Sequence, residues 1–356
     1  MPFPRLCLVP EFSPQSGVMI TWPHPDSDWQ DTLADIEPVY LAVTRAISRY
    51  ERVLLICYDD RHILHVSKLL EDAGASVHAI QYVAVRTNDT WVRDYGPLSV
   101  AASNRTSLLD FAFDGWGGKH ESGHDNQVSR RLFAAGALSV PDLSQQPLVL
   151  EGGAIDTDGF GTLLTTTRCL LESARNPGME KVALENCFHA VLGIERILWL
   201  DHGMLLGDDT DGHVDMLARF CSPHDIAYLQ CTDPDDAHYG GLMAMEQQLR
   251  GFIAHDGTPY TLHPLPMPGA VYSDAGERLP ASYANFLIIN HAVLVPVYDD
   301  PADQQALGVL QQCFPDREII AINSVALIQQ YGSLHCATMQ LPEGVLQFFV
   351  VREGTE

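Results

Sequence analysis

The sequence contains no long apolar run. Its 356 residues include no stretch of about 18 apolar residues, and the N-terminal segment MPFPRLCLVPEF has no apolar core. A membrane-spanning helix needs about 20 mostly apolar residues, and a secretory signal peptide needs an apolar core. We therefore expect neither a signal peptide nor a membrane span, and no membrane partner.

Closely spaced cysteine pairs are also absent. Eight cysteines are spread along the chain without a CxxC pair, at Cys7, Cys57, Cys169, Cys187, Cys221, Cys231, Cys313 and Cys336. Structural zinc sites use closely spaced ligands, and disulfide frameworks are typical of much shorter secreted chains. We expect reduced thiols in a cytoplasmic protein, with no structural metal site. No GxGxxG motif follows a first strand, so a dinucleotide fold has no support either.

Basic residues are scarce. The chain has 21 Lys and Arg against 46 Asp and Glu, a formal net charge of −25. Such a charge repels nucleic acid and anionic lipid and attracts cations. We expect no nucleic-acid partner, and a small cationic substrate or a basic peptide fits this charge. A simple gain in solubility explains the same excess.

Short β-like runs alternate with helical stretches along the chain. Residues 17–23 and 52–59 are typical of strands, and the stretch 31–50 between them has apolar residues at helical spacing. The stretch 147–167 predicts two strands joined by the hairpin signal DTDGFG. Hairpins interleaved with helices predict an α/β protein with mixed sheets.

Polar residues are concentrated where predicted strands meet loops, which is where scaffolds usually carry chemistry. Four stretches stand out: TNDTWVRDYGP at 87–97, LEGGAIDTDG at 150–159, GDDTDGHVDMLARF at 207–220 and YGSLHC at 331–336. Simple alternatives exist for the first two. Arg93 and Asp94 can form a surface ion pair that contributes little, and Glu151 can precede an ordinary turn.

The third stretch is rich in possible ligands and proton carriers. Asp208, Asp209, Asp211, His213 and Asp215 lie within eight residues. Their spacing differs from that of an EF-hand calcium loop. In an extended segment His213 and Asp215 would share a face, because side chains alternate with a period of two. A metal site on these two residues would need further ligands, and an acidic surface turn also remains open.

The fourth stretch places a histidine next to a cysteine. If His335 and Cys336 lie in a strand, their side chains point to opposite faces. His335 would then be a poor base for Cys336, and His213 is the better candidate. Together the four stretches suit one substrate group. Two carboxylates can hold a planar guanidinium along its edges and leave its central carbon open to a thiolate.

Six segments resemble, in the same order, the motifs of agmatine deiminases and Porphyromonas-type peptidylarginine deiminases. They are WVRDYGP, FDGWGG, LEGGAIDTDGFGTLLTTTRCLLESARNP, DDTDGHVDMLARF, SYANFLIIN and LHCAT. The resemblance covers nearly the whole chain. It implies a pentein fold, an α/β propeller of five pseudo-symmetric ββαβ-type repeats around a central site. It also implies one catalytic domain over residues 1–356.

The resemblance implies a role for each site residue. Cys336 corresponds to the nucleophile and His213 to the general acid and base. Asp94 and Asp215 correspond to the carboxylates that hold the guanidinium, with Glu151 in a supporting position.

Other positions of the resemblance concern the walls and the far end of the site. Trp91 and Trp116 would wall the pocket. Asp209 stands where the family usually has a Glu that helps bind the far amine of agmatine. The segment YGSLHC also has fewer glycines than is usual before the cysteine.

We therefore expect a hydrolase that converts agmatine to N-carbamoylputrescine and ammonia through a covalent cysteine thiouronium intermediate, without a cofactor. Alternatives are a deiminase of peptidylarginine or free arginine that gives citrulline, with Arg93 and Arg219 as candidate partners of a substrate carboxylate. An amidinotransferase, a metal-dependent hydrolase built on His213 and Asp215, and a non-catalytic pentein binding protein are further alternatives. The sequence leaves the oligomeric state open, and a homo-oligomer is possible. Polyamine synthesis would follow from the agmatine reaction.

Overall fold

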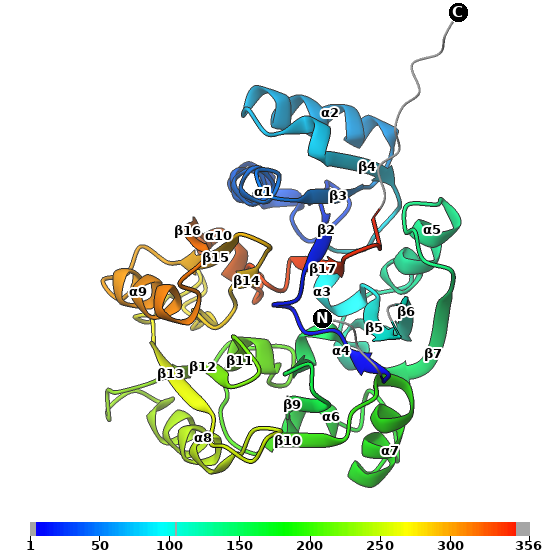
Figure 1. The fold of residues 1–356 in the computed structure, drawn as a ribbon. Helices are drawn as coiled ribbons and strands as arrows, with labels where there is room; N and C mark the ends of the chain where they lie inside the picture. Colours follow the sequence, from blue (N-terminus) through cyan, green and yellow to red (C-terminus); the bar gives the residue numbers. More distant parts are fainter. Residues whose placement is uncertain (1–4, 104, 347–356) are drawn as a thin grey trace, which may run out of the picture.

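The computed structural model describes residues 5–103 and 105–346. In this part of the chain the fold is mixed α/β, as expected from the sequence, with five separate sheets. Figure 1 shows the sheets arranged around a common centre, with the longer helices on the outside. The centre is therefore built from the inner ends of strands and from the short turns that follow them.

The first sheet joins the two ends of the chain. Its strand order is β17-β2-β3-β4, where β17 pairs antiparallel with β2 and the other pairs are parallel. The bounds are β2 (Gln15–Thr21), β3 (Arg52–Cys57), β4 (Ile80–Ala84) and β17 (Thr338–Pro342). Helices α1 (Leu33–Ile47) and α2 (Asp60–Asp72) make the crossovers that parallel strands require. Nearly all residues of β2 and β3 are buried, so both strands belong to the core.

The second sheet has the order β1-β5-β6-β7. Its strands are β1 (Cys7–Leu8), β5 (Leu98–Ala102), β6 (Arg105–Ala112) and β7 (Leu143–Val149). The short α3 (Val92–Tyr95) precedes β5, and α4 (Gly115–Gly118) and α5 (Val128–Ala134) lie between β6 and β7. The short α3 and α4 thus place the WVRDYGP and GWGG motifs beside this sheet.

The other three sheets share one pattern: an antiparallel pair, then a helical crossover to a parallel third strand. Their strands are β8 (Ile155–Thr157), β9 (Thr162–Thr166) and β10 (Arg196–Leu200); β11 (Ala218–Phe220), β12 (Asp225–Gln230) and β13 (Thr261–Pro266); β14 (Leu287–Ile288), β15 (Ala292–Val297) and β16 (Glu318–Asn323). The helices are α6 (Thr167–Leu170), α7 (Lys181–Leu192), α8 (Tyr239–Gly251), α9 (Asp303–Cys313) and α10 (Val325–Ile328). Short 3₁₀ turns are Gln30–Thr32, Val77–Ala79, Asp125–Gln127, Gly152–Ala154 and Val214–Met216.

Several local expectations are confirmed and two are wrong. The helix expected at 31–50 is α1, and the DTDGFG hairpin joins β8 and β9. The stretch after His213 is not extended, because it begins with the 3₁₀ turn Val214–Met216. His335 and Cys336 do not lie in a strand either, since β17 begins at Thr338. The alternation of side chains in a strand therefore applies to neither pair.

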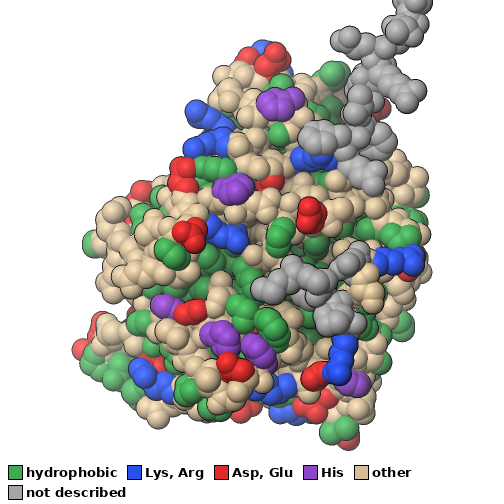
Figure 2. Space-filling view, in the orientation of Figure 1, with side chains coloured by type: hydrophobic (Ala, Val, Ile, Leu, Met, Phe, Trp, Pro, Cys, Tyr) green, Lys and Arg blue, Asp and Glu red, His purple; other side chains and the backbone are tan. Residues whose placement is uncertain are grey.

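Charged side chains of both signs lie on the outer surface of the molecule. On the face shown in Figure 2, basic and acidic side chains are interspersed. No helix within the described ranges is both long and apolar enough to cross a membrane.

Candidate active site

A cavity of about 240 Å³ brings together seven of the eight residues singled out from the sequence. These seven are Trp91, Asp94, Trp116, Asp209, His213, Asp215 and Cys336. The remaining lining residues are Asp28, Asp89, His120, Asp208, Thr210, Met216, Gln330, Tyr331 and Gly332. Glu151, the eighth, lies behind His213 and does not line the cavity.

The glycine pair after Glu151 permits close approach of the catalytic candidates. A Cβ atom on Gly153 would lie 2.6 Å from His213 Nδ1 and 2.9 Å from Asp94 Oδ1. The backbone N–H of Gly153 also donates to Asp94 Oδ1 at 3.0 Å. Any larger residue would displace these side chains, so glycine is required here.

Asp94 is held at both oxygens. Gly153 binds one oxygen, and the indole Nε1 of Trp116 donates to the other at 2.9 Å. Trp116 reaches this position from a left-handed backbone conformation with φ of 59°. Burial raises the pKa of the Asp94 carboxyl to about 6, with contributions from the negative charges of Asp215 and Glu151, although His213 opposes them.

Asp215 has a different environment on the opposite side. Its Oδ2 atom lies 2.8 Å from Nδ1 of His335, while Oδ1 is buried without a hydrogen-bond partner. Burial alone would raise the pKa of Asp215, but its hydrogen bond with His335 and the positive charges of His213 and Arg219 outweigh burial and lower that pKa. Asp215 is therefore an ionised carboxylate at the cavity, with one oxygen that has no hydrogen-bond partner.

Cys336 sits next to Asp215 in the turn before β17. Its Sγ lies 3.6 Å from Asp215 Oδ2 and accepts a hydrogen bond from Asn285 Nδ2 at 3.2 Å. Burial, Asp215 and Asp94 raise the pKa of the Cys336 thiol well above its usual range. Without a nearby cation this cysteine is a neutral thiol.

His213 lies between two carboxylates. Its Nδ1 is 3.6 Å from Asp94 Oδ1, and its Nε2 is 3.7 Å from Glu151 Oε2. Burial alone would lower the pKa of His213, but Asp94, Cys169 and Glu151 raise it well above its usual range. The site thus favours an imidazolium, which can give up a proton during a reaction.

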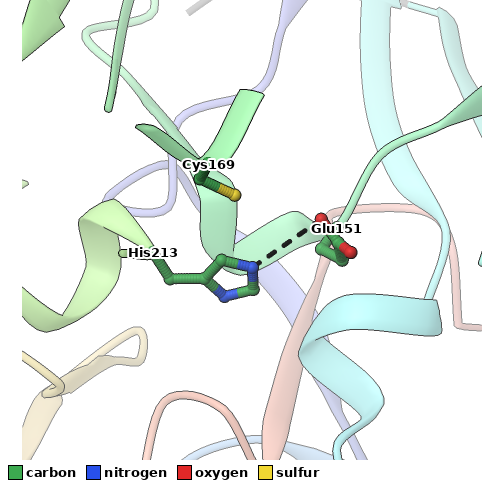
Figure 3. A group of neighbouring side chains, drawn as sticks. All are labelled: Glu151, Cys169 and His213. Atoms are coloured by element: carbon green, nitrogen blue, oxygen red, sulfur yellow. Dashed lines mark ion pairs between the residues drawn. The ribbon is translucent and has the colours of Figure 1, made fainter. Parts of the chain in front are cut away.

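Cys169 on α6 is a second thiol near this histidine. Figure 3 shows Cys169, Glu151 and His213 facing one another, with potential ligand atoms within 4.8 Å. Arg175 Nε already binds both Glu151 oxygens, at 2.7 and 2.9 Å, and an imidazolium does not bind a metal. The cluster therefore suits proton transfer better than metal binding. Cys169 is completely buried and does not line the cavity, whereas Cys336 does.

The outer part of the cavity is acidic. Asp28, Asp89 and Asp208 line it together with Asp209, whose Oδ2 lies 3.4 Å from Nε2 of His120. Burial, with a contribution from Asp28, raises the pKa of Asp89 to about 7. Within the described residues, no Lys or Arg lines this cavity.

One glycine shapes the wall formed by the indole of Trp91. A Cβ atom on Gly332 would lie 2.3 Å from Cζ3 of Trp91. The indole therefore packs directly against the backbone of the YGS segment. This close packing explains the glycine of YGS.

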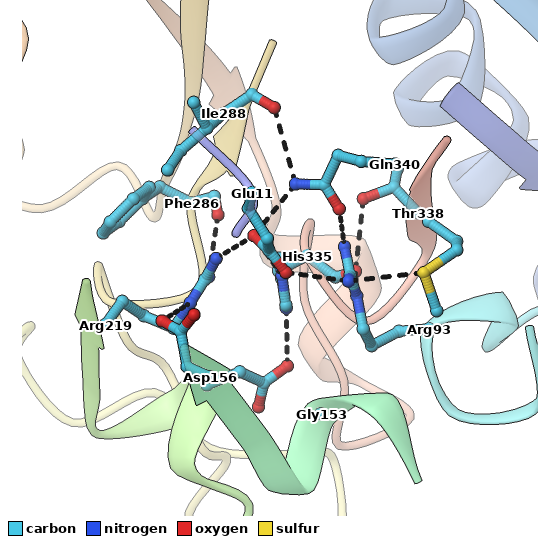
Figure 4. Close-up of polar contacts among 12 residues, drawn as sticks. Glu11, Arg93, Gly153, Asp156, Arg219, Phe286, Ile288, His335, Thr338 and Gln340 are labelled. Carbon is cyan, nitrogen blue, oxygen red and sulfur yellow. Dashed lines mark hydrogen bonds and ion pairs between the residues drawn. The ribbon is translucent and has the colours of Figure 1, made fainter. Parts of the chain in front are cut away.

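The arginines near the motifs belong to a separate buried network, shown in Figure 4. Arg93 Nη1 binds Glu11 Oε1 at 2.8 Å, and Arg219 Nε binds Asp156 Oδ2 at 3.0 Å. Arg219 also pairs with Glu11, and Glu11 Oε1 lies 2.8 Å from Nε2 of His335. The expected surface pair of Arg93 with Asp94 is wrong, because Arg93 is buried and turns to Glu11. Neither arginine is available to a substrate carboxylate.

The sequence model of the Porphyromonas-type peptidyl-arginine deiminase family matches residues 7–342. The chain belongs to this family. A provisionally named agmatine deiminase of Vibrio parahaemolyticus is 35% identical, over 93% of this chain and 95% of its own length.

Solved structures agree with this membership. A Porphyromonas gingivalis structure, provisionally named an arginine deiminase, is 46% identical with a TM-score of 0.89, covering 96% of this chain and 100% of that one. A C. jejuni agmatine deiminase with a cysteine-to-serine change and substrate bound is 34% identical with a TM-score of 0.88. The alignment with it covers 96% of this chain and 97% of that chain.

Several residues of this deiminase-family site were missed by the sequence reasoning. Asn285 lies in the SYANFLIIN motif, which indicated only a strand, and Arg175 lies in ESARNP. Glu11 carries no local signal, because it is a single acidic residue near the N-terminus. His335 was set aside as pointing away from Cys336, yet both side chains reach Asp215 Oδ2.

Proposed function

We propose that this protein is an agmatine deiminase, which hydrolyses agmatine to N-carbamoylputrescine and ammonia. One observation carries the proposal: a thiol, an imidazolium and two buried carboxylates surround a cavity that no described Lys or Arg lines. We also propose that the five sheets are the blades of a pentein propeller within one catalytic domain over residues 1–356.

Substrate binding activates the nucleophile in this proposal. Asp94 and Asp215 hold the two edges of the guanidinium, and its positive charge favours the ionised form of both buried carboxylates. The same charge lowers the pKa of the nearby Cys336 thiol, which loses its proton to solvent. The enzyme thus forms its thiolate where a guanidinium is bound and stays unreactive otherwise.

The first half of the reaction forms the covalent intermediate. The Cys336 thiolate attacks the guanidinium carbon, and a C–S bond forms as a C–N double bond becomes single. His213 donates its proton to one nitrogen of the tetrahedral adduct, which leaves as ammonia when its C–N bond breaks. The product is an S-alkylthiouronium on Cys336, with a neutral His213 beside it.

The second half consumes water. Neutral His213 takes a proton from the water whose oxygen attacks the thiouronium carbon. The C–S bond then breaks as the C–O bond becomes double and the hydroxyl loses its proton to solvent, so the thiolate of Cys336 is restored and the carbamoyl product leaves. Glu151 supports His213 in both steps, because its negative charge 3.7 Å from Nε2 favours the imidazolium.

The charge of the outer cavity favours a dicationic substrate. Asp28, Asp89 and Asp209 can oppose the primary amine of agmatine, whereas the carboxylate of free arginine would meet carboxylates. Trp91 and Trp116 wall the site around the flat guanidinium. Peptidyl or free arginine stays the second candidate, because the 46% identical P. gingivalis structure is provisionally named an arginine deiminase.

Product analysis tests the proposal and its alternatives. The purified protein is incubated with agmatine, free arginine, an arginyl peptide and other guanidines, and urea-type products and ammonia are measured. We expect kcat/KM to be highest for agmatine and unchanged by a chelator. Higher kcat/KM with arginine or an arginyl peptide would move the substrate to that class. If product forms only when an amine acceptor is added, the protein is an amidinotransferase. Loss of activity with a chelator would indicate a metal-dependent hydrolase. Binding of the guanidine without turnover would indicate a non-catalytic protein.

Three further expectations accompany the agmatine reaction. The product is a precursor of putrescine, so a place in polyamine synthesis follows. Cytoplasmic location and assembly into a homo-oligomer stay predictions. Cell fractionation and light scattering of the purified chain would test them.

A further inference from the structure

His335 is a fully buried side chain that contacts two carboxylates with its two ring nitrogens. Its Nδ1 lies 2.8 Å from Asp215 Oδ2, and its Nε2 lies 2.8 Å from Glu11 Oε1. Figure 4 shows the ring beside Glu11. His335 does not line the cavity, so any effect it has on a substrate there must pass through a neighbouring side chain.

The ring of His335 is held in a fixed place. Its backbone N–H donates to Asn285 Oδ1 at 2.8 Å, and its backbone C=O accepts from Arg93 Nε at 3.4 Å. Glu11, at the far end of the ring, is bound in turn by the guanidinium groups of Arg93 and Arg219. A side chain held at its backbone and at one ring nitrogen is a rigid support for whatever contacts the other nitrogen.

Asp215 needs such a support more than Asp94 does. Each oxygen of Asp94 accepts a hydrogen bond, one from Gly153 and one from Trp116. For the Asp215 carboxylate, the donors among the described residues are Nδ1 of His335 and the Cys336 thiol, and both reach Oδ2. Its Oδ1 has no partner. The orientation of the Asp215 carboxylate therefore depends on two donors at one oxygen.

The deiminase chemistry removes one of these two donors. Once the Cys336 thiol has lost its proton, it cannot donate to Asp215, and two negative groups face each other at 3.6 Å. In the described part of the chain, His335 is then the remaining hydrogen-bond donor to this carboxylate. Its hydrogen bond offsets part of the charge on Oδ2 and prevents the carboxylate from turning away from the thiolate.

We propose that His335 is a positioning residue of the deiminase reaction. It fixes Asp215 so that Oδ1 is left for a guanidinium N–H while Oδ2 stays beside the sulfur of Cys336. The inference rests on the proposed deiminase function and extends it to a residue outside the cavity. The positive charges of His213 and Arg219 also act on Asp215, but neither side chain forms a described hydrogen bond with its carboxylate.

A matched pair of substitutions separates the two ring nitrogens. His335→Asn places an amide N–H near the position of Nδ1, so the hydrogen bond to Asp215 is kept and the contact with Glu11 is lost. His335→Gln places the amide near Nε2, so the contact with Glu11 is kept and the hydrogen bond to Asp215 is lost. A role in folding alone predicts similar losses in both variants, because each keeps one of two contacts with a buried carboxylate.

Steady-state kinetics of the full chain tests the positioning role. We expect kcat/KM for agmatine to fall about 30-fold in His335→Gln and only about 3-fold in His335→Asn, because the hydrogen bond to the charged Asp215 is lost in the first variant alone. Urea denaturation should give similar unfolding midpoints for the two variants. Equal kcat/KM in both variants, or the larger loss in His335→Asn, would overturn the role of His335.

The outcome for the parent chain is separate. A parent that turns over no guanidine would overturn the deiminase function itself, and the role of His335 with it. A parent that turns over agmatine, with two variants that match each other, would overturn the role of His335 alone.

A crystal structure with substrate tests the same geometry without a change at His335. The Cys336→Ala variant is crystallised with agmatine, because it is expected to bind the substrate without turnover. We expect Asp215 Oδ2 to stay within hydrogen-bonding distance of His335 Nδ1 and Oδ1 to accept from the guanidinium. An Asp215 side chain that has left His335 to bind the guanidinium with both oxygens would overturn the proposal, even if neither His335 variant folds.

Discussion

Two regions of buried charge lie back to back at the centre of this molecule. One is the cavity cluster, defined by Asp94, His213, Asp215 and Cys336. The other is the Glu11 network, in which Glu11 and Asp156 pair with Arg93 and Arg219. His335 connects them, with Nδ1 on Asp215 and Nε2 on Glu11.

The two regions both contain buried carboxylates, but these carboxylates have different partners. In the Glu11 network each carboxylate has a guanidinium partner, and the pKa of Glu11 is well below its usual range, although burial opposes this. In the cavity cluster burial raises the pKa of Asp94 to about 6. Two guanidinium partners lower the pKa of Glu11, whereas Asp156, beside Arg219 alone, keeps a pKa raised by burial to about 6, and in the cavity the pKa of Asp215 is lowered. The cavity has the carboxylates without the guanidinium, as a binding site for one requires.

The largest expected effect is the loss of the nucleophile. Replacing Cys336 by Ala should lower kcat for agmatine at least about 10³-fold, because no covalent intermediate can form. Binding should persist, since both carboxylates stay, and isothermal titration with agmatine would measure it. The matched control is Cys169→Ala, near His213 but outside the cavity. If Cys169→Ala abolished turnover and Cys336→Ala did not, the nucleophile would be misassigned.

The second-largest expected effect comes from a substitution in the Glu11 network, which leaves the residues that line the cavity unchanged. Glu11→Gln leaves Arg93 and Arg219 buried with less compensation, so the free energy of unfolding should fall by about 3 kcal/mol. Because the folded pKa of Glu11 is lowered, its stabilisation is present above the unfolded pKa and is lost as pH falls through the folded pKa. Urea denaturation at several pH values measures this. The exposed Glu71→Gln variant is the control, and equal stability of the two variants would contradict the pairing.

A substitution in the cavity should affect catalysis rather than the Glu11 network. Asp94→Asn removes one charged hydrogen-bonding partner of the guanidinium, so kcat/KM for agmatine should fall by about 10- to 100-fold. Steady-state kinetics would measure it in parallel with Glu11→Gln. Unchanged kcat/KM in Asp94→Asn would exclude Asp94 as a guanidinium ligand.

The same variant should alter how stability depends on pH. The folded pKa of Asp94, about 6, lies above its value in the unfolded chain. Its contribution is therefore fully present below the unfolded pKa and is lost as pH rises through about 6. At pH 8 Asp94→Asn should be more stable than the parent by on the order of 1–3 kcal/mol, and the difference should shrink toward pH 4. Thermal unfolding without substrate measures it, and a difference independent of pH would contradict the assignment.

The smallest effect concerns the outer end of the cavity. Asp209 is partly exposed and faces His120, so Asp209→Asn should raise KM for agmatine by only about 2- to 5-fold. For a monocationic guanidine without an amine, KM should not change, and this substrate is the control. A loss comparable to that of Asp94→Asn would mean that Asp209 contributes more than an exposed charge can.

Site residues that lie inside sequence motifs could be predicted from the sequence. Trp91, Asp94, Asp209, His213 and Cys336 were chosen from the sequence, and the structure places all of them on one cavity. The prediction was wrong where it depended on the local backbone conformation. His335 was judged from strand alternation, but it lies in a turn, and its ring reaches the same Asp215 oxygen as the Cys336 thiol. A turn of a few residues leaves no periodic pattern that could have corrected this.

The sequence by itself determined the mixed α/β class, the family and the residue types of the site, because these depend on local periodicity and on ordered motifs. Only the tertiary structure decided which charges are compensated. Glu11 pairs with Arg93, Arg219 and His335 from distant parts of the chain, and Asp94 pairs with none of these three side chains. Coulomb interactions depend on distance in space and on burial, and neither can be read from separation along the chain.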